Sequence, residues 1–476
     1  MKHIIYQLLP RLWGSGKFSS VDTGSLAYFK GLGVDYIWYT GIIRHASKNS
    51  GEKVVKGDAG SPYAITDYYD VNPYLADNEG RRMEEFGALI DRTHAMGLKV
   101  IMDFVPNHVA RENVNFTEED FFCFPGEELK LPVDADGYTE MPARASGNCF
   151  SATPGINDWY ETVKLNYGDR RTRTWDKMLK IVRFWASKGV DGFRCDMVEL
   201  VPPQFMQWLI ASIKEEFPGV IFIAEVYEKE KYRMYVNEVG FDLLYDKSGL
   251  YDTLRAVTCN NATARSISWN WQFLGDLQPN MLNFLENHDE QRLASDFFCG
   301  TASNAYAALA VSALLNDAPF MLYFGQEIGE KGMDQEGFSG RDGRTTIFDW
   351  WKIASIERLN TWIKDHRKGL NSQEKAVLKT YTQVLELAKT PAFAQGKTFD
   401  LCYCQDSERF NADKHFAFLR SDGKKTMLVV SNFAWEEPDI TVRIPTEALD
   451  YLEIKLVRTV YTLTVPAHDF RIIEIN

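Results

Sequence analysis

The sequence predicts a (β/α)8 barrel that is interrupted by one insertion and followed by a small antiparallel β domain. Three observations support this fold class. Short apolar runs alternate with longer helical patterns over about the first 390 of the 476 residues, as in a parallel sheet buried on both faces. Eight such runs can be counted. After about residue 395, apolar residues instead recur at every second position, which is typical of antiparallel strands.

The eight apolar runs are the expected barrel strands, because each is short and most are followed by a turn or a helical pattern. They cover residues 3–9, 34–40, 99–108, 190–196, 220–226, 241–246, 281–289 and 320–327. The clearest helices expected between them cover residues 25–33, 81–97, 178–189 and 203–217. A doubly wound open sheet is the alternative, but no GxGxxG fingerprint follows the first strand.

One connection is too long for an ordinary barrel loop. Between residues 109 and 165 the chain has Pro, Gly, Asn and acidic turns but no helical pattern of useful length. A stretch of this kind indicates an inserted subdomain or a functional loop. The predicted organisation is a barrel in two parts, an inserted subdomain between them and a C-terminal β-sandwich domain. The barrel covers residues 1–108 and 166–394, the inserted subdomain covers 109–165, and the C-terminal domain covers 395–476.

The composition is that of a globular protein, with 45% hydrophobic and 25% charged residues. A net charge of −13 argues against nucleic acid or an anionic membrane as a partner, since both favour a basic surface. We find no signal peptide and no run of eighteen apolar residues, so a cytoplasmic protein without a membrane span is expected. The seven Cys residues include no CxxC pair and are expected to be core thiols, with Cys402 and Cys404 on one face of a strand.

Polar side chains follow four of the expected strands, at the carboxyl ends where a barrel carries its active site. They are Asp103, Asn107 and His108, then Arg194 and Asp196, then Glu225, and finally Glu286, Asn287, His288 and Asp289. A single buried acid at a strand end is usually structural. Several carboxylates crowded at one opening are costly in desolvation and repulsion, which favours a catalytic role.

Paired carboxylates are what the hydrolysis of a glycosidic bond requires, one ionised and one protonated. Arg194 lies two residues before Asp196, so both side chains point to the same face of the strand and the guanidinium favours an ionised Asp196. Glu225 follows an apolar run, IFIA, whose surroundings would raise its pKa as a general acid requires.

The segments DFVPNH, GFRCD, AEV and ENHD, in this order and at strand ends, resemble the four motif regions of the α-amylase family of glycoside hydrolases. SPYAITDYYDVNP at 61–73 is similar to the family's stretch after the second strand. The resemblance covers nearly the whole chain and implies a retaining enzyme that acts on α-linked glucosides. It implies that Asp196 is the nucleophile, Glu225 the general acid/base and Asp289 the transition-state stabiliser. It also implies that Tyr63 stacks on the sugar ring and that Asp103 is a structural acid beneath the site. The implied contacts to glucose are Arg194, His108 and His288.

Other residues near these motifs leave two interpretations open. Arg292 is either a salt bridge at the barrel mouth or a substrate contact, and we include it among the candidate substrate-binding residues. Trp269 and Trp271 suit packing on one side of a strand somewhat better than a sugar platform. Glu327, after the eighth strand, is expected to be a structural acid, and residues 341–349 resemble a loop that borders the family's substrate cleft.

The substrate expected from this resemblance is a short α-1,4-linked malto-oligosaccharide. Starch-degrading family members often carry Lys-His three and four residues past the nucleophile, where this chain has Glu199 and Leu200. That departure disfavours internal cleavage of long polymers. Transglycosylation or isomerisation through the same glycosyl-enzyme, as in trehalose-forming relatives, is the alternative. A non-catalytic binding subunit is disfavoured, because all three catalytic acids are present.

No cofactor is expected to be required for activity. Many family members bind a structural Ca²⁺ between the barrel and the insertion, where Asn107 could supply one oxygen and the main chain of Leu200 another. The insertion also offers Asp134, Asp136, Glu140 and Asp158. Ca²⁺ needs six to eight converging oxygens, and the DADG run at 134–137 is too short to supply them. We therefore expect these acids to be solvated and calcium to be dispensable.

Overall fold

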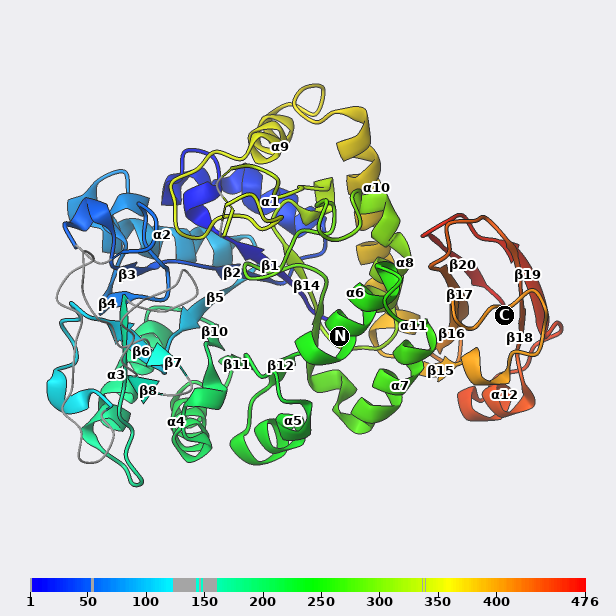
Figure 1. Cartoon of the computed structure of the whole chain (residues 1–476), viewed down its shortest axis with the longest axis horizontal. Coiled ribbons are helices and arrows are strands. Elements are labelled where there is room, and N and C mark those ends of the chain that lie inside the picture. The colour runs from blue at the N-terminus through cyan, green and yellow to red at the C-terminus, as the bar shows by residue number, and fades with distance from the viewer. Residues whose placement is uncertain are drawn as a thin grey trace.

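Eight parallel strands close into a barrel in the computed structural model, which describes residues 2–52, 55–122, 143–144, 147–148, 161–335, 337–338 and 340–476 (Figure 1). The barrel strands are β1 (Ile4–Leu8), β2 (Tyr36–Tyr39), β5 (Lys99–Phe104), β10 (Gly192–Cys195), β11 (Ile221–Ala224), β12 (Leu243–Tyr245), β13 (Met281–Phe284) and β14 (Phe320–Tyr323). Each lies within one of the eight predicted runs, so the predicted fold class is confirmed. Apart from the first residues of β5 and β11, every residue of these strands is buried, which explains why they read as continuous apolar runs.

Helices follow or precede most of the barrel strands. They are α1 (Thr23–Gly31), α2 (Arg82–Ala95), α3 (Arg173–Ser187), α4 (Pro203–Glu216), α5 (Tyr232–Met234), α6 (Asp252–Thr258), α7 (Arg265–Leu274), α8 (Tyr306–Leu314), α9 (Ala354–Lys364) and α10 (Ser372–Ala388). Local signals set several boundaries. Asp22 caps α1, and α10 begins with a capping box in which Asn371 and Glu374 each accept the other's main-chain N–H. Among the described residues, none of the helices has the length and apolar character needed to cross a membrane.

Two small antiparallel strand pairs stand at the barrel mouth. β3 (Ile43–His45) pairs with β4 (Ile65–Val71), and β6 (His108–Ala110) pairs with β9 (Thr162–Lys164). The second pair joins the two ends of the predicted insertion, so the chain leaves the barrel after β5 and returns beside its own starting point. Within the insertion the other described elements are the 3-10 turn Glu118–Asp120, β7 (Ala143–Arg144) and β8 (Gly147–Asn148). The acids Asp134, Asp136, Glu140 and Asp158 lie outside the described residues.

The C-terminal part is built from two antiparallel sheets. The larger has the order β15-β16-β17-β20 and the smaller contains β18 and β19. Their bounds are β15 (Lys397–Asp400), β16 (His415–Ser421), β17 (Thr426–Asn432), β18 (Asp439–Arg443), β19 (Val460–Thr464) and β20 (Phe470–Glu474). The barrel helix α8 packs on β17, and the short helix α11 (Pro391–Ala394) packs on β16. Figure 1 shows this part on the opposite side of the barrel from β6, β7 and β8.

Two local expectations were wrong. Cys402–Cys404 form a 3-10 turn and not a strand, because the edge strand β15 ends at Asp400, whose carboxylate accepts the N–H of Cys402. Trp269 and Trp271 lie on the helix α7, where a spacing of two turns them to different sides, so Trp269 is 66% exposed while Trp271 is half-buried. The helix α12 (Thr446–Leu452) lies between β18 and β19.

Candidate active site

The centre of the candidate site is Arg194, near the end of β10. The register of β10 with β5 places Arg194 beside Asp103, and the next strand, β11, leads to Glu225. Arg194 Nη1 donates to Oδ1 of Asp196 at 2.5 Å, and Nη2 pairs with Oε1 of Glu225 at 2.9 Å. A third carboxylate oxygen, Asp103 Oδ1, lies 3.6 Å from Nη1. One guanidinium therefore faces acids from three neighbouring strand ends.

Arg194 itself has no exposed surface and is not among the residues that line the cavity described below. The direct contact with glucose that the resemblance implies for Arg194 stays a prediction. Its role is electrostatic, because a buried, permanently charged guanidinium offsets part of the repulsion among the acids above it.

One cation does not fully offset four acids, and their pKa values reflect this. Burial raises the pKa of Asp196 and of Glu225 above the ordinary values for these groups, although Arg194 opposes the shift. Burial also raises the pKa of Asp103 to about 7, and burial together with the negative charge of Glu225 raises the pKa of Asp289 to about 8. The cluster therefore keeps one or more protons near neutral pH, as acid–base catalysis requires.

Glu225 is held by two contacts that the sequence patterns did not reveal. The Met197 N–H donates to Oε2 at 2.8 Å, and the Tyr227 hydroxyl donates to Oε1 at 2.7 Å. Met197 lies directly after Asp196 and has a left-handed φ of 47°, which aims its N–H at Glu225. In an extended segment, a Tyr two residues past a Glu lies on the same side of the chain. This spacing is the feature of the sequence from which the contact between Tyr227 and Glu225 could have been predicted.

His288 is fixed by contacts on both ring nitrogens. Nδ1 lies 2.8 Å from Nε2 of Gln7, and Nε2 lies 2.5 Å from the Tyr63 hydroxyl and 3.2 Å from Oδ2 of Asp289. Because the Gln7 amide nitrogen is a donor, Nδ1 accepts and Nε2 carries the proton. Burial lowers the pKa of His288 well below its ordinary value, so the ring is neutral.

Tyr63 stacks on His288 with ring centroids 5.3 Å apart. Its hydroxyl also lies 3.4 Å from Oδ1 of Asp103, whose other oxygen accepts the indole N–H of Trp38 at 3.1 Å. Asp103 is thus buried beneath the site, in the position expected for a structural acid. The second expected histidine, His108, is neutral because burial lowers its pKa to about 3.

These groups surround a cavity of about 350 Å³. Six of the predicted residues line it: Tyr63, His108, Asp196, Glu225, His288 and Asp289. The other lining residues are Lys56, Ser61, Glu161, Thr162, Met197, Tyr227, Phe338, Ile347 and Phe348. Phe348 and Ile347 belong to the stretch 341–349 that was expected to border the cleft.

The cavity wall includes a buried pair that sequence reasoning missed, Lys56 with Glu161 at 3.8 Å. The two residues come from the loop before β4 and from the end of the insertion, so only the tertiary fold brings them together.

Arg292 makes the salt bridge that the sequence left open, and its contact with substrate stays a prediction. Its Nη1 donates to Oε2 of Glu286 at 2.8 Å and to the main-chain oxygen of Phe324 at 2.9 Å. The side chain has no exposed surface and lies outside the cavity wall. Glu327 is likewise a buried structural acid, which accepts the hydroxyl groups of Tyr6 at 2.8 Å and Tyr28 at 2.9 Å.

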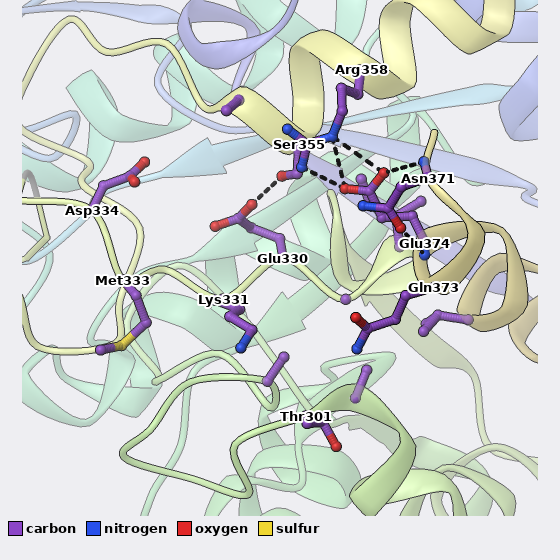
Figure 2. A pocket seen from close by; sticks show the side chains of 16 residues that line it. Thr301, Glu330, Lys331, Met333, Asp334, Ser355, Arg358, Asn371, Gln373 and Glu374 are labelled. Carbon is purple, nitrogen blue, oxygen red and sulfur yellow. Dashed lines mark hydrogen bonds and ion pairs between the residues drawn. The ribbon is translucent and has the colours of Figure 1, made fainter. Parts of the chain in front are cut away.

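A second cavity, of about 320 Å³, lies between α9, α10 and the loop after β14 (Figure 2). Its two best-placed carboxylates are already used within the protein. Glu374 pairs with Arg358 and caps α10, and Glu330 accepts the hydroxyl of Ser355. We therefore assign the chemistry to the cavity at the barrel mouth.

The variant Asp289→Asn is expected to melt at a higher temperature than the wild type, with a larger gain at about pH 9 than at about pH 5. A folded-state pKa near 8 exceeds the ordinary carboxyl value, so the wild type loses stability as pH rises through that window, whereas Asn carries no charge to lose. Because the side chain is 33% exposed, we expect a gain of only about 1–3 °C. Thermal melts at both pH values measure it, and an equal shift at both would contradict the assignment.

The chain matches family models over most of its length. Residues 16–396 match the α-amylase catalytic domain, and residues 409–472 match the C-terminal domain of maltogenic amylase. Alpha-amylase 3 of Dictyoglomus thermophilum is 26% identical over 396 residues, which cover 78% of this chain and 73% of that protein. Oligo-1,6-glucosidase of Bacillus cereus is 23% identical, over 95% of this chain and 93% of its own.

The fold is also that of solved family members. A noncanonic maltogenic α-amylase from Thermotoga neapolitana superposes with a TM-score of 0.66 at 20% identity, covering 100% of this chain and 96% of its own. Since the catalytic-domain model spans well over half of the sequence, the chain belongs to the α-amylase family of glycoside hydrolases.

Proposed function

We propose that this enzyme hydrolyses α-1,4-linked malto-oligosaccharides with retention of anomeric configuration. The observation that carries the proposal is the contact of one guanidinium with both Asp196 and Glu225, which brings two carboxyl groups to the same cavity. Retaining glycosidases need such a close pair, about 5 to 5.5 Å apart, whereas inverting enzymes leave room for a water between the acids.

In the first step, an ionised Asp196 attacks the anomeric carbon while Glu225 protonates the leaving oxygen. The bond to the leaving sugar breaks as the bond to Asp196 Oδ forms, giving a glycosyl-enzyme. In the second step, Glu225 removes a proton from water, and the water displaces Asp196. Asp289 and the two neutral histidines, His108 and His288, face the same cavity and serve to position the sugar, and Asp289 in its ionised form stabilises positive charge on the sugar ring.

Two features favour short substrates. A cavity of about 350 Å³ is near the lower end of the range for ligand sites, which suits a few sugar rings better than a long groove. Glu199, at a position where starch-degrading relatives often have Lys, accepts the main-chain N–H groups of Tyr227 at 2.8 Å and Glu228 at 3.1 Å. Its carboxylate is thus engaged in fixing the loop after β11.

A second candidate is cleavage of α-1,6 bonds in oligosaccharides of similar size. The observation that favours it is the similarity, over 90% or more of this chain, to proteins named oligo-1,6-glucosidase and glucan 1,6-α-glucosidase. The same acids would perform either reaction, and the residues around the leaving sugar would select the linkage.

The test is to incubate the enzyme with maltose, maltotriose, isomaltose, trehalose, sucrose and starch and to follow the products by chromatography and proton NMR. We expect maltotriose to be cleaved faster than starch, and the first sugar released to be the α-anomer, because two inversions at one carbon restore the starting configuration. Initial β-anomer would overturn the retaining mechanism. Faster cleavage of isomaltose than of maltose or maltotriose would select the second candidate, and accumulation of new disaccharides would indicate transfer instead of hydrolysis.

A further inference from the structure

Lys164 links three segments at the barrel mouth. It ends β9, where it lies opposite His108 of β6, and its side chain is half-buried. Its Nζ donates to Oδ1 of Asn107 at 2.5 Å and to the main-chain oxygen of Leu200 at 2.9 Å. Leu200 ends the 3-10 turn Val198–Leu200. The ammonium thus joins the loops after β5 and β10 to the returning end of the insertion.

Each of these loops carries a group of the candidate site. The Asn107 amide nitrogen lies 3.1 Å from Nδ1 of His108, so the position of Asn107 affects the ring in the cavity wall. The turn that ends at Leu200 starts from Met197, whose left-handed backbone directs its N–H to Glu225. Such a backbone is uncommon for a residue with a side chain and is held by its surroundings.

The family resemblance implies a calcium ion at this place, held in part by the same two oxygens. The residues present do not fit that ion. Ca²⁺ binds oxygen at about 2.3–2.6 Å, so an ion on both oxygens would overlap the ammonium, whose charge would also repel it. Among the described residues, no group of three or more His, Cys, Asp or Glu side chains could hold a metal ion.

We propose that the Lys164 ammonium is the internal cation that positions the loops of Asn107 and Leu200, in place of a bound calcium ion. The ammonium donates to converging oxygens where a metal ion would bind them. Because it belongs to the chain, its presence does not depend on the calcium concentration in solution. Lys164 is a positioning residue, since it reaches the reacting groups only through Asn107, His108 and the turn that starts at Met197. The stability part of the proposal does not depend on the proposed substrate.

The wild-type enzyme is tested first, by thermal melts near neutral pH with excess EDTA and with added CaCl2. We expect the melting temperature and the rate on maltotriose to agree within about 2 °C and about 20% between the two conditions, because no metal is part of this site. A fall of about 10 °C in EDTA that Ca²⁺ reverses would overturn the proposal. This measurement needs no variant and remains decisive if a Lys164 variant fails to fold.

The variants Lys164→Met and Lys164→Arg then separate charge from packing. Met keeps the volume but removes the ammonium that donates to the two oxygens, so we expect the melting temperature to fall by about 3 °C or more. We expect kcat to fall at least about tenfold at a temperature far below melting, because small displacements of catalytic groups are costly. Arg restores a cation and should recover part of both losses.

The matched control is Lys180→Met, at an exposed lysine on α3, which should behave as the wild type. A Lys164→Met enzyme with wild-type melting and rate would overturn the proposal, as would equal losses in the Met and Arg variants. If Lys164→Met melts early as expected while the wild type acts on none of the sugars tested, the proposed function fails and the role of Lys164 in stability stands.

Discussion

The variant Asp196→Asn is expected to lose hydrolysis by about 10⁴-fold or more in kcat while remaining folded. The amide is nearly isosteric with the carboxylate but cannot form the glycosyl-enzyme, so the first step has no nucleophile. Burial raises the pKa of Asp196, so ionising this carboxyl group costs free energy in the folded protein. A neutral amide should therefore be tolerated at the same position. Initial rates on the best sugar of the panel measure the loss.

Asp91→Asn is the matched control, because Asp91 is an exposed residue on the outer helix α2. It should keep wild-type rate and melting temperature. Asp196→Asn should melt within about 3 °C of the wild type, since Arg194 retains Glu225 and Asp103 as partners. Residual activity above a few per cent of the wild type, after correction for contaminating enzyme, would show that another group is the nucleophile.

The barrel and its acids could be predicted from the sequence because both follow from strand geometry. Strands buried on both faces are mostly apolar, so they are visible as runs such as IIYQL and YIWY. The polar residues that follow them must then lie at one end of the barrel. Asp196, Glu225, His288 and Asp289 line one cavity for that reason, although they are distant in sequence.

Depth and direction of side chains were not predictable in the same way. The Arg194 guanidinium is fully buried, and the Arg292 side chain pairs with Glu286. The surroundings of each side chain come from neighbouring strands and loops, which the local sequence does not reveal. Trp269 was misplaced because its spacing to Trp271 fits a strand, and the helix was decided by tertiary packing.

Partners that come from separate loops were also missed. The contacts of Lys164 with Asn107 and Leu200 join three loops, and the pair of Lys56 with Glu161 joins two. No periodic pattern connects residues across such distances. The structure therefore adds to the predicted acids the groups that hold and surround them, which is where members of one family can differ in substrate and metal dependence.

Glu225→Gln is expected to reduce cleavage of natural sugars by about 10³-fold but to reduce cleavage of α-glucosyl fluoride far less, by about tenfold. Fluoride leaves without a proton, so the first step no longer needs the acid, whereas an alkoxide leaving group does. The Gln oxygen can still accept the Tyr227 hydroxyl, while the amide nitrogen replaces the carboxylate oxygen that accepts the Met197 N–H, so one of the two contacts is kept. Rates on maltotriose and on the fluoride, measured with the same enzyme samples, give the two losses.

The pH profile supplies an independent check on the same residue. In the wild type, kcat/KM should rise as the acid pair loses its first proton and fall as it loses its second, and the falling limb should lie above the ordinary range for Glu because burial raises the pKa of Glu225. In Glu225→Gln the falling limb should vanish on the fluoride, since no acid remains to be deprotonated. Glu228→Gln, at an exposed carboxylate three residues from Glu225, is the matched control and should keep the wild-type profile. Equal losses on maltotriose and fluoride, together with an unchanged falling limb, would assign the acid to another group, of which Asp289 is the nearest candidate by its pKa of about 8.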